Sequence, residues 1–272
     1  MKSAITVSLV PQAKGGPFVF WNGLADACAQ AAALGFDAIE IFPPSADAID
    51  RGELRRLLDQ HGLDVAAVGT GGGWVVNKWT LTHADAAIRE QAKKFIKAII
   101  DVAGDVGAPA IIGSMQGRWE GEVTHQQAAT HLAYALGELG AHAARQGQPL
   151  LYEPLNRYET NLFNRLGDTA AFLRSLEATN VQILADLYHM NIEETDLAAA
   201  LRDAGELVGH IHFADSNRRA IGLGHTVIAP VIAALRDLGY TGYLSAEILP
   251  LPDSANAARQ TIESFRRCMT QA

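Results

Sequence analysis

The sequence predicts an α/β protein of the (β/α)8 TIM-barrel class, in which eight parallel strands alternate with helices. Short apolar and β-branched runs alternate with longer Ala/Leu-rich segments of helical period, at roughly 34 residues per unit over the 272-residue chain. The strand runs are continuously apolar, as in parallel strands that are buried on both faces. Eight such units in succession favour a closed barrel over an open doubly wound sheet, which is the main alternative.

The apolar runs and the helical segments can be assigned in order along the chain. Strands are predicted near 4–10, 37–42, 64–69, 108–113, 149–153, 181–186, 207–213 and 243–248. Helices are predicted near 22–34, 47–60, 84–104, 126–146, 168–178, 196–204, 228–238 and 254–270. Thr124 with Gln127 three residues later, and Asp168 or Asp253, are typical of helix starts. Five glycines are expected to follow helix ends: Gly35, Gly62, Gly107, Gly147 and Gly239.

Composition narrows the class of protein. The chain is 49% hydrophobic with a formal net charge of −8, and we expect a single barrel domain over 1–272. It has no basic run, which disfavours nucleic acid or an anionic membrane as the main partner. Cys28 and Cys268 lack the spacing of a disulfide framework or a zinc site. With no recognisable signal peptide or membrane-length apolar stretch, we expect a soluble, cytoplasmic protein.

Four side chains that can bind a metal each end a predicted strand: Glu153, Asp186, His212 and Glu247. Their spacings are 33, 26 and 35 residues. Because the C-terminal ends of barrel strands converge on one face, these groups are expected to meet there. Three carboxylates and one imidazole suit a hard divalent cation such as Mg2+ or Mn2+. Spacing alone leaves open whether His210 or His212 is the ligand, because residues two apart on a strand share a side.

This set of groups indicates sugar chemistry next to a carbonyl. A bound cation could chelate a carbonyl and a neighbouring hydroxyl oxygen, acidify the proton between them and stabilise the cis-enediolate left by its removal. Glu153 and Glu247, on the fifth and eighth strands, are expected to remove and return the proton on opposite faces, which inverts the carbon. The predicted activity is therefore that of an epimerase.

Three alternatives use the same scaffold. An aldose–ketose or hydroxypyruvate-type isomerase would need one carboxylate base, and the two apposed glutamates disfavour it. An abasic-site endonuclease is disfavoured by the acidic net charge. A sugar-binding barrel without catalysis is disfavoured because all four ligands and both bases are present.

The longest segments that follow strands are expected to lie on the catalytic face, where loops of a barrel carry function. These segments are 69–83, 113–125, 154–167 and 214–227. Trp74, Trp79 and Trp119 lie in two of them and are candidates for aromatic walls of a pocket.

Several motifs resemble one family. The sequence is similar to the ketose 3-epimerases of the D-tagatose/D-psicose 3-epimerase type, within the xylose isomerase-like barrel superfamily. The motifs are YEPLNRYET (152–160), ILADLYHMNIEE (183–194) and GHIHFADSNRR (209–219). The branch that contains 5-keto-L-gluconate epimerase looks closest, on VGTGGG (68–73), LTH (81–83) and IIG…GRWEG (111–121).

The resemblance implies a metal site and two bases. It selects the second histidine of HIH, His212, so that Glu153, Asp186, His212 and Glu247 would bind Mn2+ in the first place, or Co2+ or Mg2+. It also implies that the two glutamates exchange the C3 proton of the substrate. Members of this family are usually homodimers or homotetramers, and we expect the same here.

The resemblance also implies substrate contacts. Glu159, His189 and Arg218 match positions that hold the O1–O3 end and the carbonyl of an unphosphorylated ketose or keto-sugar acid. Arg118 would suit a substrate carboxylate, with Trp119 as a neighbouring contact. One departure is Ala220-Ile221-Gly222, where the family often has Pro-Gly, and it predicts a different loop shape near Arg218.

Overall fold

The computed structural model describes residues 1–176 and 180–270, and its eight strands form a closed barrel in chain order. Each strand pairs in parallel with the next, and β8 pairs with β1. The strands are β1 (Lys2–Ser8), β2 (Ala38–Phe42), β3 (Asp64–Gly69), β4 (Ala110–Ile112), β5 (Leu150–Tyr152), β6 (Val181–Asp186), β7 (Val208–His212) and β8 (Tyr243–Ala246). The prediction of a (β/α)8 barrel, rather than an open sheet, is confirmed.

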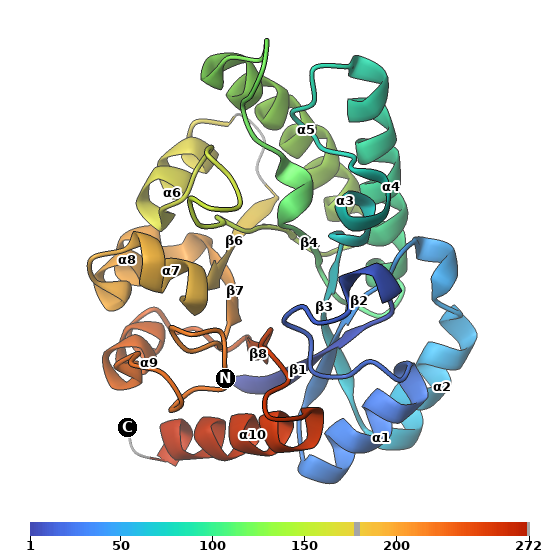
Figure 1. Cartoon of the computed structure of the whole chain (residues 1–272), viewed down its shortest axis with the longest axis vertical. Helices are drawn as coiled ribbons and strands as arrows, with labels where there is room; N and C mark the ends of the chain where they lie inside the picture. Colours follow the sequence, from blue (N-terminus) through green and yellow to red (C-terminus); the bar gives the residue numbers. More distant parts are fainter. Residues whose placement is uncertain (177–179, 271–272) are drawn as a thin grey trace.

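The helices surround the barrel as a ring, with α10 beside α1 where the ring closes (Figure 1). They are α1 (Leu24–Leu34), α2 (Arg51–His61), α3 (Gly72–Asn77), α4 (Ala86–Gly104), α5 (His125–Arg145), α6 (Leu166–Arg174), α7 (Leu187–Glu193), α8 (Leu197–Ala204), α9 (Ile228–Asp237) and α10 (Ser254–Thr270). Short 3-10 turns are η1 (Pro11–Ala13), η2 (Ala46–Ala48), η3 (Ser114–Gln116) and η4 (Gly205–Leu207). None of these described helices is both long and apolar enough to cross a membrane.

Helix boundaries follow the predicted signals in most places. Thr124 and Gln127 form a reciprocal capping box at the start of α5, and the Asp253 carboxylate accepts a hydrogen bond from the Asn256 amide in α10. All five glycines expected at helix ends have positive φ. The prediction that Asp168 marks the start of a helix is wrong by a few residues. Asp168 lies in the first turn of α6, and Arg165 occupies the cap position. Residues 177–178 of the helix predicted over 168–178 lie outside the described residues.

Two short helices were not predicted, α3 and α7, and both follow strands at the catalytic face. α3 forms within the loop predicted over 69–83, where Gly72 permits close packing. A Cβ atom on Gly72 would lie 2.3 Å from the Pro43 carbonyl oxygen. α7 begins immediately after β6, and the Asp186 carboxylate caps it by accepting the Tyr188 amide at 2.7 Å.

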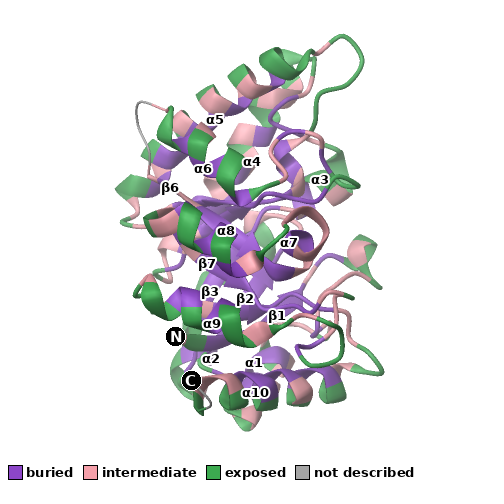
Figure 2. Cartoon of the chain, turned by 90° about the vertical axis from the view of Figure 1, so that its left-hand side faces the viewer, coloured by how far each residue is buried: buried purple, intermediate pink, exposed green. Residues whose placement is uncertain are grey.

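Burial follows the layers of a barrel. The strands are almost entirely buried, while exposed residues lie on the outward faces of the helices (Figure 2). The main apolar cluster fills the space between the strands and the helix ring, with Ile5, Ile39, Val68, Ile112 and Ile183 among the fully buried strand residues. This rigid frame fixes the strand ends that carry the polar groups.

Candidate active site

The structure brings together the four groups predicted as metal ligands. Each of Glu153, Asp186, His212 and Glu247 offers one ligand atom, and these atoms all lie within 4.8 Å of one another. The His212 Nδ1 atom is 3.4 Å from Glu153 Oε1, 3.4 Å from Asp186 Oδ2 and 3.8 Å from Glu247 Oε2. All four residues are buried.

Strand ends position these groups. Asp186 and His212 are the last residues of β6 and β7, and Glu153 and Glu247 directly follow β5 and β8. The predicted strands 149–153 and 243–248 were therefore slightly too long. The side chains still point into the barrel mouth, because the C-terminal ends of neighbouring strands face one point.

The cluster has the properties of a cation site. Glu153 Oε1, Asp186 Oδ2 and His212 Nδ1 are buried and make no hydrogen bond within the described chain. Buried polar atoms without partners are costly, and oxygen and imidazole ligands suit a divalent cation. Burial opposes charge on His212, but Glu40 and the surrounding carboxylates raise its pKa well above the usual value. The carboxylates thus favour a positive charge at this point, which a divalent cation would supply.

Glu40 holds two histidines beneath the cluster, and sequence reasoning missed it. Its carboxylate oxygens lie 2.7 Å from His210 Nε2 and 2.9 Å from His212 Nε2. Both rings lie on one side of β7, as a regular strand requires, but His212 alone presents Nδ1 to the other ligands. Burial would raise the pKa of Glu40, and the two histidines lower it to about 2. The signal in the sequence is a single acid within the apolar strand AIEIF.

The three predicted substrate contacts lie around this cluster. Arg218 forms an ion pair with Glu247 and lies 3.6 Å from Asp186 Oδ2 and 3.8 Å from Glu159 Oε1. Its guanidinium also stacks over the Tyr188 ring at 4.6 Å. The buried His189 places Nε2 at 3.9 Å from Glu153 Oε1.

Asn156 orients His189 and Glu159, and it is a second residue that sequence reasoning did not single out. Its side-chain amide donates to His189 Nδ1 at 2.7 Å and to Glu159 Oε1 at 3.2 Å. Since Nδ1 accepts this bond, the proton of a neutral His189 is on Nε2, which has no other partner among the described residues. His189 therefore directs a donor toward Glu153 and the cluster.

Electrostatics differ among the carboxylates. Burial would raise the pKa of Asp186, but His189, His212 and Arg218 lower it far below its usual range. Burial raises the pKa of Glu247, against the opposing effect of the Arg218 ion pair. The two acids thus differ in their tendency to hold a proton, although both belong to one cluster.

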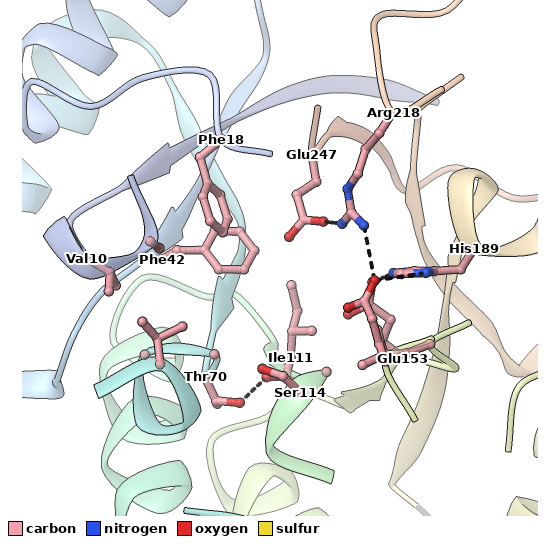
Figure 3. Close-up of a pocket in the computed structure, with 17 residues that line it drawn as sticks. Val10, Phe18, Phe42, Thr70, Ile111, Ser114, Glu153, His189, Arg218 and Glu247 are labelled. Carbon is pink, nitrogen blue, oxygen red and sulfur yellow. Dashed lines mark hydrogen bonds and ion pairs between the residues drawn. The ribbon is translucent and has the colours of Figure 1, made fainter. Parts of the chain in front are cut away.

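A pocket of about 110 Å³ opens above the cluster. Glu153, His189, Arg218 and Glu247 occupy one side, and the rings of Phe18 and Phe42 face them (Figure 3). The two phenylalanine rings contact each other, with centroids 4.5 Å apart. One wall is therefore apolar and the other carries all the titratable groups, an arrangement common in sites for small molecules.

Gly113 and Gln116 fix the position of Glu153. A Cβ atom on Gly113 would lie 2.5 Å from Glu153 Oε2, so a glycine is required for the carboxylate to adopt this position. The buried Gln116 amide donates to the Glu153 carbonyl oxygen at 2.9 Å, and its oxygen accepts the Tyr152 hydroxyl at 2.5 Å.

The loop that carries Arg218 is organised by Asp215, which the sequence analysis did not single out. The buried Asp215 carboxylate accepts backbone amides of Ser216, Gly222, Gly224 and Thr226 at 2.7 to 3.0 Å. Gly222 has φ of 92°. The Ala220-Ile221-Gly222 segment, where the family often has Pro-Gly, is therefore part of a closed, hydrogen-bonded loop.

Arg118 and Trp119 lie farther out than the other predicted contacts. Arg118 lines a neighbouring groove, where its Nε atom is 3.9 Å from Glu120 Oε2. Trp119 is held to the segment that follows β5, because its indole N–H donates to the Asn161 carbonyl oxygen at 2.9 Å. Trp79 packs against the Phe95 ring and Trp74 lines the same groove as Arg118.

Comparison with known proteins identifies the family of this chain. The model of the xylose isomerase-like TIM barrel family matches residues 28–268. The chain belongs to this family. A D-psicose 3-epimerase from Agrobacterium fabrum is 31% identical over 244 residues, which cover 86% of this chain and 79% of the relative. A 3-dehydro-D-guloside 4-epimerase from Escherichia coli is 31% identical over 242 residues, or 86% and 91% of the two chains.

Solved structures extend the likeness to the whole fold. A crystal structure of D-allulose 3-epimerase from Methylomonas sp. superposes with a TM-score of 0.81 at 26% identity, over 98% of this chain and 99% of that one. The predicted resemblance to the ketose epimerases is confirmed. The prediction of an isomerase is also confirmed, in the broad sense that includes epimerases.

Proposed function

We propose that this protein is a metal-dependent epimerase that inverts the carbon next to the carbonyl of an unphosphorylated ketose or keto-sugar acid. One observation carries the proposal: four buried ligand atoms of Glu153, Asp186, His212 and Glu247 converge within 4.8 Å at the mouth of the barrel. The relatives support the reaction class. In D-psicose the inverted C3 adjoins the C2 carbonyl, and in a 3-dehydroguloside the inverted C4 adjoins the C3 carbonyl.

The four ligands would hold Mn2+, with Co2+ or Mg2+ as alternatives. When bound, the cation would polarise the substrate carbonyl and stabilise the negative charge that develops beside it. The protein contributes the pocket, whose buried walls limit the access of water to the reacting carbon.

Glu153 and Glu247 would act as the two bases. They follow β5 and β8, which are three strands apart in the closed barrel, so their carboxylates approach the pocket from different sides. One removes the proton from the carbon next to the carbonyl, and the other delivers a proton to the opposite face. For a 2-ketose this carbon is C3.

Neighbouring residues would orient the substrate and the bases. Arg218 holds Glu247 through an ion pair, and Gly113 leaves room for Glu153. His189 Nε2 would donate to a substrate oxygen, since Asn156 occupies Nδ1. Glu159, which is partly exposed at the mouth, would accept a hydrogen bond from a substrate hydroxyl.

The experiment is NMR in D2O with Mn2+-loaded protein. D-fructose, D-tagatose, L-ribulose, 5-keto-gluconate and a methyl 3-keto-glucopyranoside would be supplied separately. Deuterium next to the carbonyl with accumulation of the inverted epimer is the expected result. Deuterium at C1 with an aldose product would instead indicate the isomerase alternative, and no exchange with any compound would reject the proposal.

A base variant tests the two-sided mechanism. In Glu247→Gln with bound metal, we expect epimerisation to fall about a thousandfold. Glu153 should still exchange the proton of one epimer with solvent. Unchanged epimerisation by this variant would overturn the role of Glu247.

A further inference from the structure

A second, larger cavity adjoins the candidate active site. We call it the outer groove; it lies between Trp74 of α3 and Tyr158 after β5, and its volume is about 640 Å³, compared with 110 Å³ for the inner pocket. Ser114 and Glu159 line both spaces, so the groove lies directly beside the pocket. α3 borders both, with Val75 on the inner pocket and Trp74 on the groove. The volume is typical of sites for small organic ligands.

Two exposed aromatic side chains line the outer groove. Trp74 is 38% exposed and Tyr158 is 77% exposed. The Lys78 ammonium lies 4.6 Å from the centre of the Trp74 ring. Lys78 has φ of 59°, and among the described residues only Arg218 shares a positive φ without being glycine. At Lys78 this left-handed conformation ends α3, so the residue that closes the helix also lines the groove.

The charges in the outer groove favour an uncharged ligand. Lys78 and Arg118 share the lining with the carboxylates of Glu120, Glu122 and Glu159, so the lining has no cationic excess. Arg118 lies near the Glu120 carboxylate, which competes for its guanidinium. A phosphate or carboxylate on the ligand would meet these acids. A sugar ring matches the lining better, because its C–H face can pack on an aromatic ring while its hydroxyls bond to polar side chains.

We propose that the substrate is a keto sugar in glycosidic linkage to a second, uncharged sugar ring. The keto sugar occupies the inner pocket between Glu153 and Glu247, and the second ring lies in the outer groove against Trp74 and Tyr158. This proposal rests on the epimerase function and names its substrate class. The shared lining residues Ser114 and Glu159 support it, because two linked rings on either side of these residues would occupy the two adjacent spaces.

Matched substrate pairs test the proposal. One pair is D-fructose and fructose that carries glucose on O6. The other is a 3-keto-glucopyranoside with either a methyl group or a glucose unit as aglycone. We compare kcat/KM within each pair with Mn2+-loaded protein. At least in the 3-keto pair, we expect the compound that carries glucose to have the higher kcat/KM, by about tenfold or more. The variants Trp74→Ala and Tyr158→Ala should reduce this preference about tenfold. Tyr134→Ala is the control, because Tyr134 is equally exposed, at 78%, but lies on α5 away from the groove.

The outcomes separate the substrate class from the reaction. Equal kcat/KM within both pairs, or a preference that Trp74→Ala and Tyr158→Ala leave intact, would overturn the proposal while the epimerase function stands. If no compound is turned over, saturation-transfer NMR with the two-ring compounds gives a separate readout. Binding that depends on Trp74 would then support the sugar subsite, although the epimerase function is rejected. Absence of binding would overturn the sugar subsite as well as the epimerase function.

Discussion

Glu40 on β2 accepts a hydrogen bond from His212 on β7, with 2.9 Å between Glu40 Oε1 and His212 Nε2. This contact keeps the proton of a neutral His212 on Nε2, so that the Nδ1 lone pair faces Glu153, Asp186 and Glu247. The same carboxylate binds His210 Nε2, but His212 is the last residue of β7 and lies beside the other strand ends, so it alone offers Nδ1 to the cluster. A residue three strands away around the barrel thus orients His212, one of the four proposed ligands.

Replacement of Glu40 by Gln should weaken metal binding. The two histidines contact different oxygens of Glu40, so the NH2 group of the glutamine would replace one of these acceptors with a donor, and the substitution removes the negative charge beside His212. We expect the Kd for Mn2+, measured by titration calorimetry, to rise about 10- to 100-fold. Glu263→Gln on the exposed face of α10 is the control. An unchanged Mn2+ affinity would contradict the orienting role of Glu40.

Removal of the metal should lower thermal stability and abolish epimerisation. Without a cation, three buried carboxylates share one site and repel each other. Excess Mn2+ at about 100 times its Kd should stabilise the fold by about 2.7 kcal/mol and raise Tm by about 5 °C or more. Melting curves before and after chelation, and again after Mn2+ is restored, measure this shift. In Asp186→Asn the shift should be much smaller; a shift equal to that of the natural protein would place the metal elsewhere.

Replacement of Gly113 by Ala should reduce activity more than stability. The added Cβ would lie 2.5 Å from Glu153 Oε2 and displace that carboxylate. Because a small displacement of a catalytic group is costly, we expect kcat to fall about tenfold or more. Gly137→Ala on α5 is the matched control, since nothing lies within 4 Å of its Cβ position. That variant should retain full activity. Full activity in Gly113→Ala would show that a glycine is not required beside Glu153.

The Asp215 carboxylate should contribute stability that depends on pH. Burial alone would raise its pKa, but backbone amides of Thr226, Gly224 and Ser216 lower it. A group with a lowered folded pKa stabilises the fold above its unfolded pKa, about 3.9, and this contribution is lost as pH falls through the folded value. Asp215→Asn should therefore destabilise by about 2 kcal/mol at pH 7.

The pH profile of that variant is the decisive readout. Denaturant unfolding of both proteins should give a free-energy difference that is constant near neutral pH and shrinks below about pH 4. The same variant should raise KM, because the loop positions Arg218 over the pocket. A difference that grows on acidification would show that charge on Asp215 is not what stabilises the loop.

The sequence predicted the fold through features that repeat. Eight apolar runs of strand length, separated by helical segments, leave few arrangements other than a closed parallel barrel. The predicted ligands followed from the same regularity, since each of them ends a strand or directly follows one: Glu153, Asp186, His212 and Glu247. Strand lengths were less accurate: β5 stops at Tyr152, and Pro154 shortly after it has no N–H with which to extend the strand pairing.

By itself, the sequence determined which strand ends carry carboxylates and imidazoles, because that depends only on residue type and spacing. Tertiary structure alone decided which groups support them. Glu40 and His212 are separated by 172 residues and meet because β2 and β7 face each other across the barrel interior. Likewise, Trp74 and Tyr158 line one groove because loops after β3 and β5 cover the same face. Such contacts depend on strand tilt and on the paths of loops, which side-chain periodicity along the chain does not encode.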